Sequence, residues 1–84
     1  MKFSIVLTQR AVKDLKKLQK DVRQRIGDRL AEFSADPLRH AKKLSDPRIG
    51  TYRFRVGDYR IIFDIDANTI VVLRIGHRKR IYEE

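Results

Sequence analysis

Three arginines in the middle of the chain have the type and spacing to bind a phosphate group. Residues 51–65 alternate apolar with polar side chains on either side of Gly57-Asp58, a pair typical of a two-residue hairpin loop. Such a loop would place Arg55 directly opposite Arg60 on one face. Like charges in a cross-strand pair destabilise a sheet, so this pattern indicates that an anion binds between them. The predicted phosphate site consists of Arg53, Arg55 and Arg60.

The composition also favours an anionic partner. The chain has 20 Lys and Arg against 11 Asp and Glu, a formal net charge of +9. Such an excess favours a polyanion such as nucleic acid, although charge alone could also serve only to keep a small protein soluble. There are no cysteines, which excludes disulfides and suits a reducing cytoplasm. No His, Cys or carboxylate cluster has the spacing of a metal site, so we expect neither a metal nor a cofactor.

The N-terminal half predicts a strand followed by a helical hairpin. Residues 3–7 form an apolar run that is too short for a signal peptide or a membrane span. Thr8 is a candidate N-cap for a helix over residues 9–18. Asp21 is a candidate cap for a second helix that ends at Asp36, before proline. Four lysines are expected on the solvated helix surface: Lys13, Lys16, Lys17 and Lys20.

The C-terminal half predicts a basic connector over residues 37–50, a three-stranded meander and a tail. A three-residue turn over residues 66–68 would set Arg74 opposite Arg60, and Leu73 opposite Ile61, with a row of arginines on the open face. A strand over residues 69–75 follows, and residues 76–84 leave the sheet. The residues expected to face the helices are Tyr59, Ile61, Phe63 and Ile65.

These elements predict one two-layer α+β domain over residues 1–84. The N-terminal strand would join the three-stranded antiparallel meander in a four-stranded, mostly antiparallel sheet, with the helical hairpin on one face. The other face would be left to the arginines.

Three segments together resemble the RelE/ParE superfamily of toxin–antitoxin toxins. They read Y-R-F-R-V-G-D-Y-R-I-I-F at 52–63, I-G-H-R-K-R-I-Y at 75–82 and T-x-x-A-x-K-D-L-K-K-L at 8–18. RelE-like members are mRNA endonucleases that cut in the ribosomal A site, whereas ParE-like members inhibit DNA gyrase. The resemblance implies a cytoplasmic toxin with the ribosome and mRNA as partners. It also implies a RelB-like antitoxin that binds the toxin in a hetero-oligomer.

The arginines favour the RelE-like branch. Arg53, Arg55, Arg60, Arg78 and Tyr82 stand at positions that match RelE active-site residues. RelE-like members often carry lysine in place of the first two of these residues, and an arginine effectively cannot act as a base. The alternatives are a ParE-like gyrase inhibitor and a degenerate member without toxicity.

The resemblance assigns roles in a metal-free RNA cleavage. Arg55 and Arg60 would hold the phosphate, and Arg78 would stabilise the leaving oxygen. His77 is the candidate base, because it titrates near neutrality, although it could also be an exposed tail residue or an RNA contact. Tyr82 would stack on an RNA base or pack its ring against the sheet. The residues expected to contact RNA backbone, or else to be ordinary surface charges, are Lys42, Lys43, Arg48, Arg74, Lys79 and Arg80.

Overall fold

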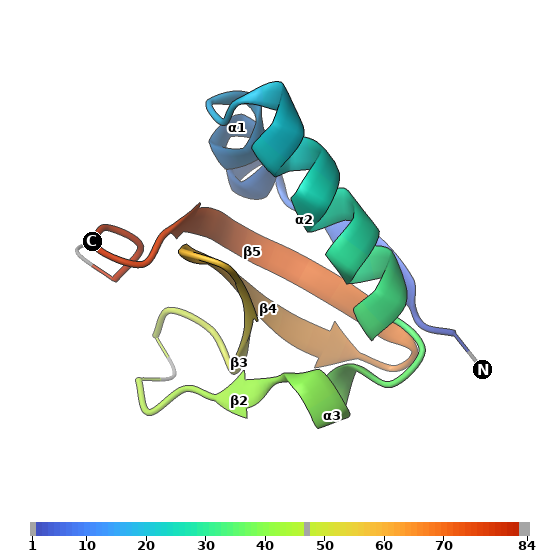
Figure 1. Cartoon of the computed structure of the whole chain (residues 1–84). Coiled ribbons are helices and arrows are strands. Elements are labelled where there is room, and N and C mark those ends of the chain that lie inside the picture. Colours follow the sequence, from blue (N-terminus) through green and yellow to red (C-terminus); the bar gives the residue numbers. More distant parts are fainter. Residues whose placement is uncertain (1, 47, 83–84) are drawn as a thin grey trace.

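The structure, a computed structural model, describes residues 2–46 and 48–82 and has the predicted two-layer α+β architecture. In Figure 1 the long helix α2 crosses one face of a twisted sheet, and the C-terminal tail lies at the end of β5. The strand order is β1-β5-β4-β3-β2, and all neighbours are antiparallel except β1 and β5. The helices are α1 (Gln9–Lys16), α2 (Lys20–Phe33) and α3 (Pro37–His40), and the strands are β1 (Ser4–Leu7), β2 (Lys42–Lys43), β3 (Tyr52–Val56), β4 (Tyr59–Asp66) and β5 (Thr69–His77).

The helical hairpin is confirmed, with different ends. The Thr8 hydroxyl oxygen accepts a hydrogen bond from the Ala11 backbone N–H at 3.1 Å, as an N-cap does. The predicted cap at Asp21 is wrong, because the N-cap of α2 is Gln19, without a side-chain hydrogen bond. Asp21 lies instead in the first turn, where its charge favours the positive end of the helix dipole.

The sheet has five strands where the sequence predicts four. Residues 42–43, expected in the connector, form β2 and pair with β3, with Lys42 opposite Arg53 and Lys43 opposite Tyr52. A two-residue strand is too short to leave an alternating pattern, so the sequence gives no sign of it. The connector also contains α3, which begins at Pro37, since proline suits the first helical position.

The hairpin of β3 and β4 has the predicted register. Arg55 pairs with Arg60, and Phe54 pairs with Ile61. Gly57 has φ 59°, the positive value that the first loop position of type I′ and II′ turns requires. The two arginines therefore do lie opposite each other on neighbouring strands.

The predicted register of β4 and β5 is wrong. The turn has two residues instead of three, with Asp66 opposite Thr69, and an irregularity follows between Ile62 and Phe63. Each change moves the pairing by one residue, so Arg60 faces Gly76 and Arg74 faces Ile62. A single shift would turn β5 over, whereas two shifts return Arg74 to the face on which it was expected.

The core fills the space between the sheet and the helices. The rings of Phe54 and Phe63 stack with centroids 4.1 Å apart, and Phe33 of α2 lies 4.7 Å from Phe54. Ile26 and Leu30 of α2 join the same cluster. The predicted helix-facing residues of β4 are confirmed, since Tyr59, Ile61, Phe63 and Ile65 all belong to this cluster or pack against it.

The C-terminal tail returns to the sheet, contrary to the expectation that it leaves. Backbone N–H groups of Arg80 and Ile81 donate to the carbonyl oxygen of His77, which closes a turn. Ile81 is 3% exposed and lies against Gly76. Residues 78–82 are thereby fixed beside the sheet, and residues 83 and 84 lie outside the described range.

Within the two described ranges, no helix combines the length and the hydropathy that crossing a membrane would require.

Candidate nucleic-acid interface

The cross-strand pair of Arg55 and Arg60 is the centre of the candidate site. Arg53 lies two residues before Arg55 on β3 and so projects on the same face. Arg55 is exposed and Arg53 is half-buried, whereas Arg60 is 7% exposed. We call these three residues the arginine cluster. In this cluster the buried Arg60 lies beside two more accessible side chains, Arg53 and Arg55.

Arg60 is held by the hairpin loop itself. Its Nη1 donates to the carbonyl oxygens of Gly57 and Tyr59, both at 3.0 Å. These contacts leave Nη2 and Nε for a ligand. The hairpin loop therefore fixes the orientation of the Arg60 guanidinium without a ligand.

The electrostatic surroundings of Arg60 disfavour its positive charge. Burial lowers the pKa of Arg60, and repulsion from Arg55 and Arg53 lowers it further, while Tyr82 acts in the opposite direction. Arg78 adds a smaller repulsion. Within residues 2–46 and 48–82, no carboxylate forms an ion pair with Arg60. An incoming phosphate would relieve this repulsion.

The two carboxylates nearest in sequence leave the cluster uncompensated. Asp64 accepts the backbone N–H of Thr51 at 2.8 Å, which ties the start of β3 to β4. Asp58 Oδ1 lies 3.7 Å from Arg78 Nε, and both side chains are more than half exposed. Exposed ion pairs contribute little stability, so a phosphate can displace Asp58 from Arg78.

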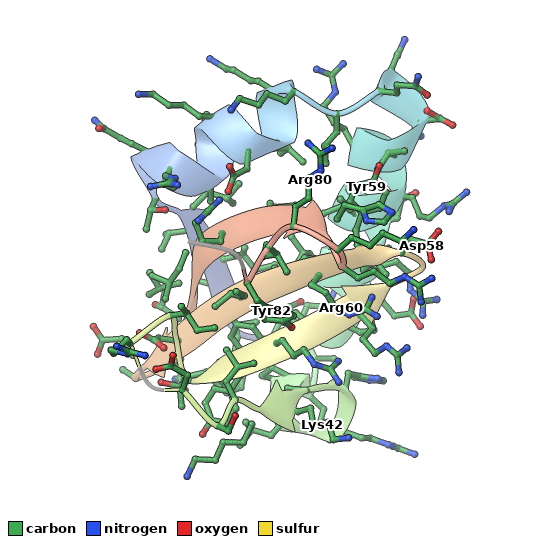
Figure 2. All side chains as sticks on the ribbon, turned by 90° about the vertical axis from the view of Figure 1, so that its left-hand side faces the viewer. Lys42, Asp58, Tyr59, Arg60, Arg80 and Tyr82 are labelled. Carbon is green, nitrogen blue, oxygen red and sulfur yellow. The ribbon has the colours of Figure 1, made fainter. Side chains whose placement is uncertain are left out.

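Tyr82 stands at the end of the tail, on the same face as the cluster. Figure 2 looks onto this face and shows Tyr82 and Arg60 in front of the central strands. Tyr82 is 42% exposed and borders a hollow of about 440 Å³, whose apolar wall is formed by Leu44 and Ile49. An aromatic ring beside an apolar hollow can receive an unstacked base.

His77 is not brought together with the arginine cluster. It pairs with Tyr59, and its ring meets the Tyr59 ring edge-on at 5.6 Å, on the helix side of the sheet. Its Nδ1 accepts the backbone N–H of Lys79 at 3.2 Å. In neutral His77 the other nitrogen then carries the proton and is a donor. This geometry argues against His77 as the base.

The two lysines of β2 differ in position. Lys42 is opposite Arg53 and shares its face, whereas Lys43 is opposite Tyr52 on the other face. Figure 2 shows Lys42 at the edge of the sheet, beyond β3. Lys42 therefore extends the arginine cluster to the edge strand, and Lys43 does not.

Two of the predicted RNA contacts are held by carboxylates. Arg48 Nε and Nη2 each lie 3.1 Å from an Asp46 oxygen, which lowers the pKa of Asp46 and raises that of Arg48. Arg74 Nε donates to Asp14 Oδ2 at 2.9 Å. The remaining two, Lys79 and Arg80, are exposed on the tail.

The sequence gives no indication of the role of Asp14. Besides Arg74, its Oδ2 accepts the backbone N–H of Ile75 at 3.0 Å, and so it joins α1 to β5. Its partners lie 60 and 61 residues away, beyond any local pattern. Among the residues that the structure describes, no three His, Cys, Asp or Glu side chains gather as a metal ion would need.

The sequence matches a family of known proteins and individual members of it. A family model described as the ParE toxin of the type II toxin–antitoxin system parDE matches residues 5–82. Toxin RelG of Mycobacterium tuberculosis is 34% identical over 85 residues, which cover 98% of each chain. Toxin RelE3 of Methanocaldococcus jannaschii is also 34% identical, over 96% of this chain and 97% of its own.

Solved structures agree with these matches. The toxin–antitoxin complex RelBE2 of M. tuberculosis contains a chain with TM-score 0.82 and 33% identity, covering 93% of this chain and all of that one. A chain of the archaeal RelE–RelB complex of Pyrococcus horikoshii has a TM-score of 0.76 and 25% identity, and the match covers 95% of this chain and 99% of that one. A mutant of Escherichia coli toxin RelE in the free state has a TM-score of 0.77 and 22% identity. The match covers 100% of this chain and 94% of that one and shows a similarity of fold alone.

Proposed function

The chain belongs to the RelE/ParE superfamily of type II toxin–antitoxin toxins, and from this premise we propose that it is a ribosome-dependent mRNA endonuclease. The observation that carries the proposal is the uncompensated arginine cluster on the sheet face away from α2. Two relatives that span nearly the whole chain are named RelG and RelE3. A ribosomal substrate would place the protein in the cytoplasm.

The proposed reaction is a metal-free attack of an RNA 2′-hydroxyl on the adjacent phosphorus. The new O2′–P bond forms as the P–O5′ bond breaks, which leaves a 2′,3′-cyclic phosphate and a 5′-hydroxyl. Arg55 and Arg60 would contact the non-bridging oxygens, because guanidinium matches phosphate in pairs of hydrogen bonds and keeps its charge. Donors fixed in advance, as Arg60 is by the loop, stabilise developing charge without reorganising.

Arg78 and Tyr82 would act on the two sides of the cut. Arg78 would exchange its exposed carboxylate partner, Asp58, for the charge on the leaving O5′. Tyr82 would stack on a base that leaves the RNA stack and enters the hollow beside it, against the apolar wall of Leu44 and Ile49. Stacking would hold the strand bent, with the 2′-hydroxyl in line for attack.

The proton acceptor lies elsewhere than His77 in this proposal. His77 is on the helix side of the sheet, and arginine cannot take a proton at working pH. Two described residues near the arginine cluster can exchange a proton: Lys42, which lies opposite Arg53, and Tyr82, whose charge acts on Arg60. Together with ribosomal groups they are the candidates for accepting the 2′-hydroxyl proton, which gives a physical reason for dependence on the ribosome.

The partner implied by the relatives is an antitoxin. The M. tuberculosis, P. horikoshii and M. jannaschii structures are complexes of a RelE toxin with RelB. We propose that a RelB-like antitoxin binds this chain in a hetero-oligomer. With a net charge of +9, the chain would favour acidic segments in such a partner.

Gyrase inhibition is the second candidate, because the matching family model describes the ParE toxin of parDE. A supercoiling assay with purified DNA gyrase separates the two functions. Inhibition of supercoiling without any mRNA cleavage would replace the endonuclease assignment. A chain that does neither, and causes no growth arrest on induction, would be a degenerate member.

The test of the proposed function is cleavage of a translated message by the purified protein and ribosomes. Mapping of 5′ ends should show cuts within A-site codons and a 5′-hydroxyl at each new end. Arg55→Ala should reduce the rate by about 10²- to 10³-fold, the usual effect of removing one donor to developing charge. Equal cleavage of naked RNA, or full activity of Arg55→Ala, would contradict the proposal.

A further inference from the structure

A basic cavity lies beside β5, one strand away from Arg60. Its volume is about 510 Å³, and three segments far apart in sequence contribute cations to it. Lys17 comes from the C-cap of α1, Arg74 from β5 and Arg80 from the tail. Lys17, expected on an ordinary solvated helix surface, is therefore part of a cavity wall.

The cavity carries an excess of positive charge. Asp14, which also lines the cavity, neutralises Arg74 through the 2.9 Å ion pair. Lys17 and Arg80 are exposed, and neither forms an ion pair within residues 2–46 and 48–82. With histidine left out of the count, three cations and one carboxylate line the cavity, a formal charge of +2.

The cavity and the arginine cluster are separated by a single strand. Gly76 lines the cavity and is the cross-strand partner of Arg60. Neighbouring strands lie about 4.8 Å apart, so the backbone that lines the cavity is one strand away from the backbone of Arg60. Because Gly76 has no side chain, Ile81 packs closely on it and anchors the tail between the sites.

The anchored tail directs its two arginines to different sites. The Arg78 side chain forms an ion pair with Asp58 at the hairpin loop. The backbone carbonyl of Asp58 also accepts a hydrogen bond from the backbone N–H of Arg78 at 2.8 Å. Arg80 lines the cavity, and Figure 2 shows its side chain pointing from the tail toward the helices, away from Arg60. The tail thus supplies one cation to each side of β5.

We propose that this cavity binds a second phosphate of the RNA strand, close to the one held by the arginine cluster, with Lys17 and Arg80 as its ligands. The proposal rests on the proposed function in that the strand is RNA. Within the described residues Lys17 and Arg80 have no ion-pair partner, and the cavity lies one strand away from Arg60. Both observations favour a phosphodiester over a protein carboxylate. Two phosphates held on either side of β5 would fix the direction of the strand across the site.

The test measures binding of an uncleavable 2′-O-methyl single-stranded RNA to the full chain over a range of salt concentrations. Each phosphate contact to a single strand contributes about 0.7 to the slope of log K against log salt. The double variant Lys17→Ala, Arg80→Ala should therefore lower the slope by about 1.4 and weaken binding by about 25-fold at ~0.1 M salt. Both residues are exposed, so circular dichroism should show an unchanged fold.

The matched control removes two other exposed cations, in Lys20→Ala, Arg39→Ala. Neither of these residues lines the cavity, so the slope should stay as in the unchanged chain. An unchanged slope in the Lys17, Arg80 variant, an equal loss in the control, or no salt-dependent binding by the unchanged chain would each overturn the proposal. Loss of binding to poly-glutamate but not to RNA would show a protein contact instead.

Failure of this inference and failure of the proposed function are distinguishable. If ribosomes with the unchanged chain cut mRNA but the slope stays constant in the double variant, only the second phosphate site is wrong. If the slope falls as expected but no cleavage occurs, the cavity binds RNA and the endonuclease assignment is wrong.

Discussion

At the scale of single residues, the arginine cluster is a site of electrostatic repulsion between like charges. Arg55 and Arg60 are cross-strand partners, and Arg53 is close enough to depress the Arg60 pKa further. Such a pair destabilises the sheet. If it serves the proposed function, its removal should raise stability and lower activity.

Replacing Arg55 by glutamine should raise thermal stability. Loss of a like-charge cross-strand pair should increase the free energy of unfolding by about 0.5 kcal/mol, within the range of such pairs. For a domain of this size that corresponds to a rise in Tm of about 2–4 °C. Differential scanning calorimetry at low salt measures the rise, which should shrink at high salt because the repulsion is screened.

Arg39→Gln is the matched control for Arg55→Gln. It removes the same charge from an exposed position on α3, outside the cross-strand pairs of the sheet. Its Tm should change less than that of Arg55→Gln. A lower Tm for Arg55→Gln would mean that the arginine cluster is not under mutual repulsion.

His77 offers a second prediction at the same scale. The Nδ1 of His77 accepts the Lys79 N–H and so helps to form the turn that directs the tail. Asparagine can keep this acceptor at a similar place, whereas alanine cannot. His77→Asn should therefore retain most cleavage, with an unchanged pH profile, and His77→Ala should retain less.

The outcome that matters for His77 is the ranking of the two variants in the ribosome assay. If His77 were the base, both variants would lose activity equally, and the acidic limb of the pH profile would disappear with them. Equal and complete loss would restore the role that the sequence predicts.

At the scale of elements, the hairpin of β3 and β4 places the arginines and the edge strand β2 extends them. The alternation of a strand puts neighbouring residues on opposite faces, so the two lysines of β2 should not be equivalent. The sequence assigns them the same role as RNA contacts. The pairing of β2 with β3 separates them.

Lys42→Ala should weaken RNA binding and slow cleavage, and Lys43→Ala should do neither. Lys42 shares a face with Arg53, so its loss should reduce the salt slope for single-stranded RNA by about 0.7. Binding curves at several salt concentrations and single-turnover cleavage rates check both. The two variants serve as controls for each other, because each removes one exposed lysine from the same two-residue strand.

Equal effects of the two lysine variants would mean that β2 contributes only general charge. A loss of cleavage in Lys42→Ala far larger than its loss of binding would indicate that Lys42 also takes the proton. That result would leave Tyr82 with stacking alone.

At the scale of the whole molecule, one face of the sheet is covered by helices and the other carries the cations. The aromatic core lies between α2 and the strands. On the opposite face Ile62 and Arg60 are buried, whereas Arg53 and Arg55 stay accessible to a ligand. The loop before β3 and the tail border this face, and each brings cations to it.

The sequence by itself determined the α+β class, the helical hairpin and the register of β3 with β4. These follow from local rules: alternation, a two-residue loop with glycine, and an N-cap at Thr8. Since the loop defines the pairing, the opposition of Arg55 and Arg60 was also predictable.

Only the tertiary structure decided which other charges belong to a site. The two-residue turn and the irregularity in β4 moved Arg74 away from Arg60, and Asp14 of α1 then neutralised it. His77 fell on the helix side, and Lys17 joined Arg80 across the end of β5. Such contacts join residues about 60 positions apart, and no local pattern records them, because packing of whole elements brings them together.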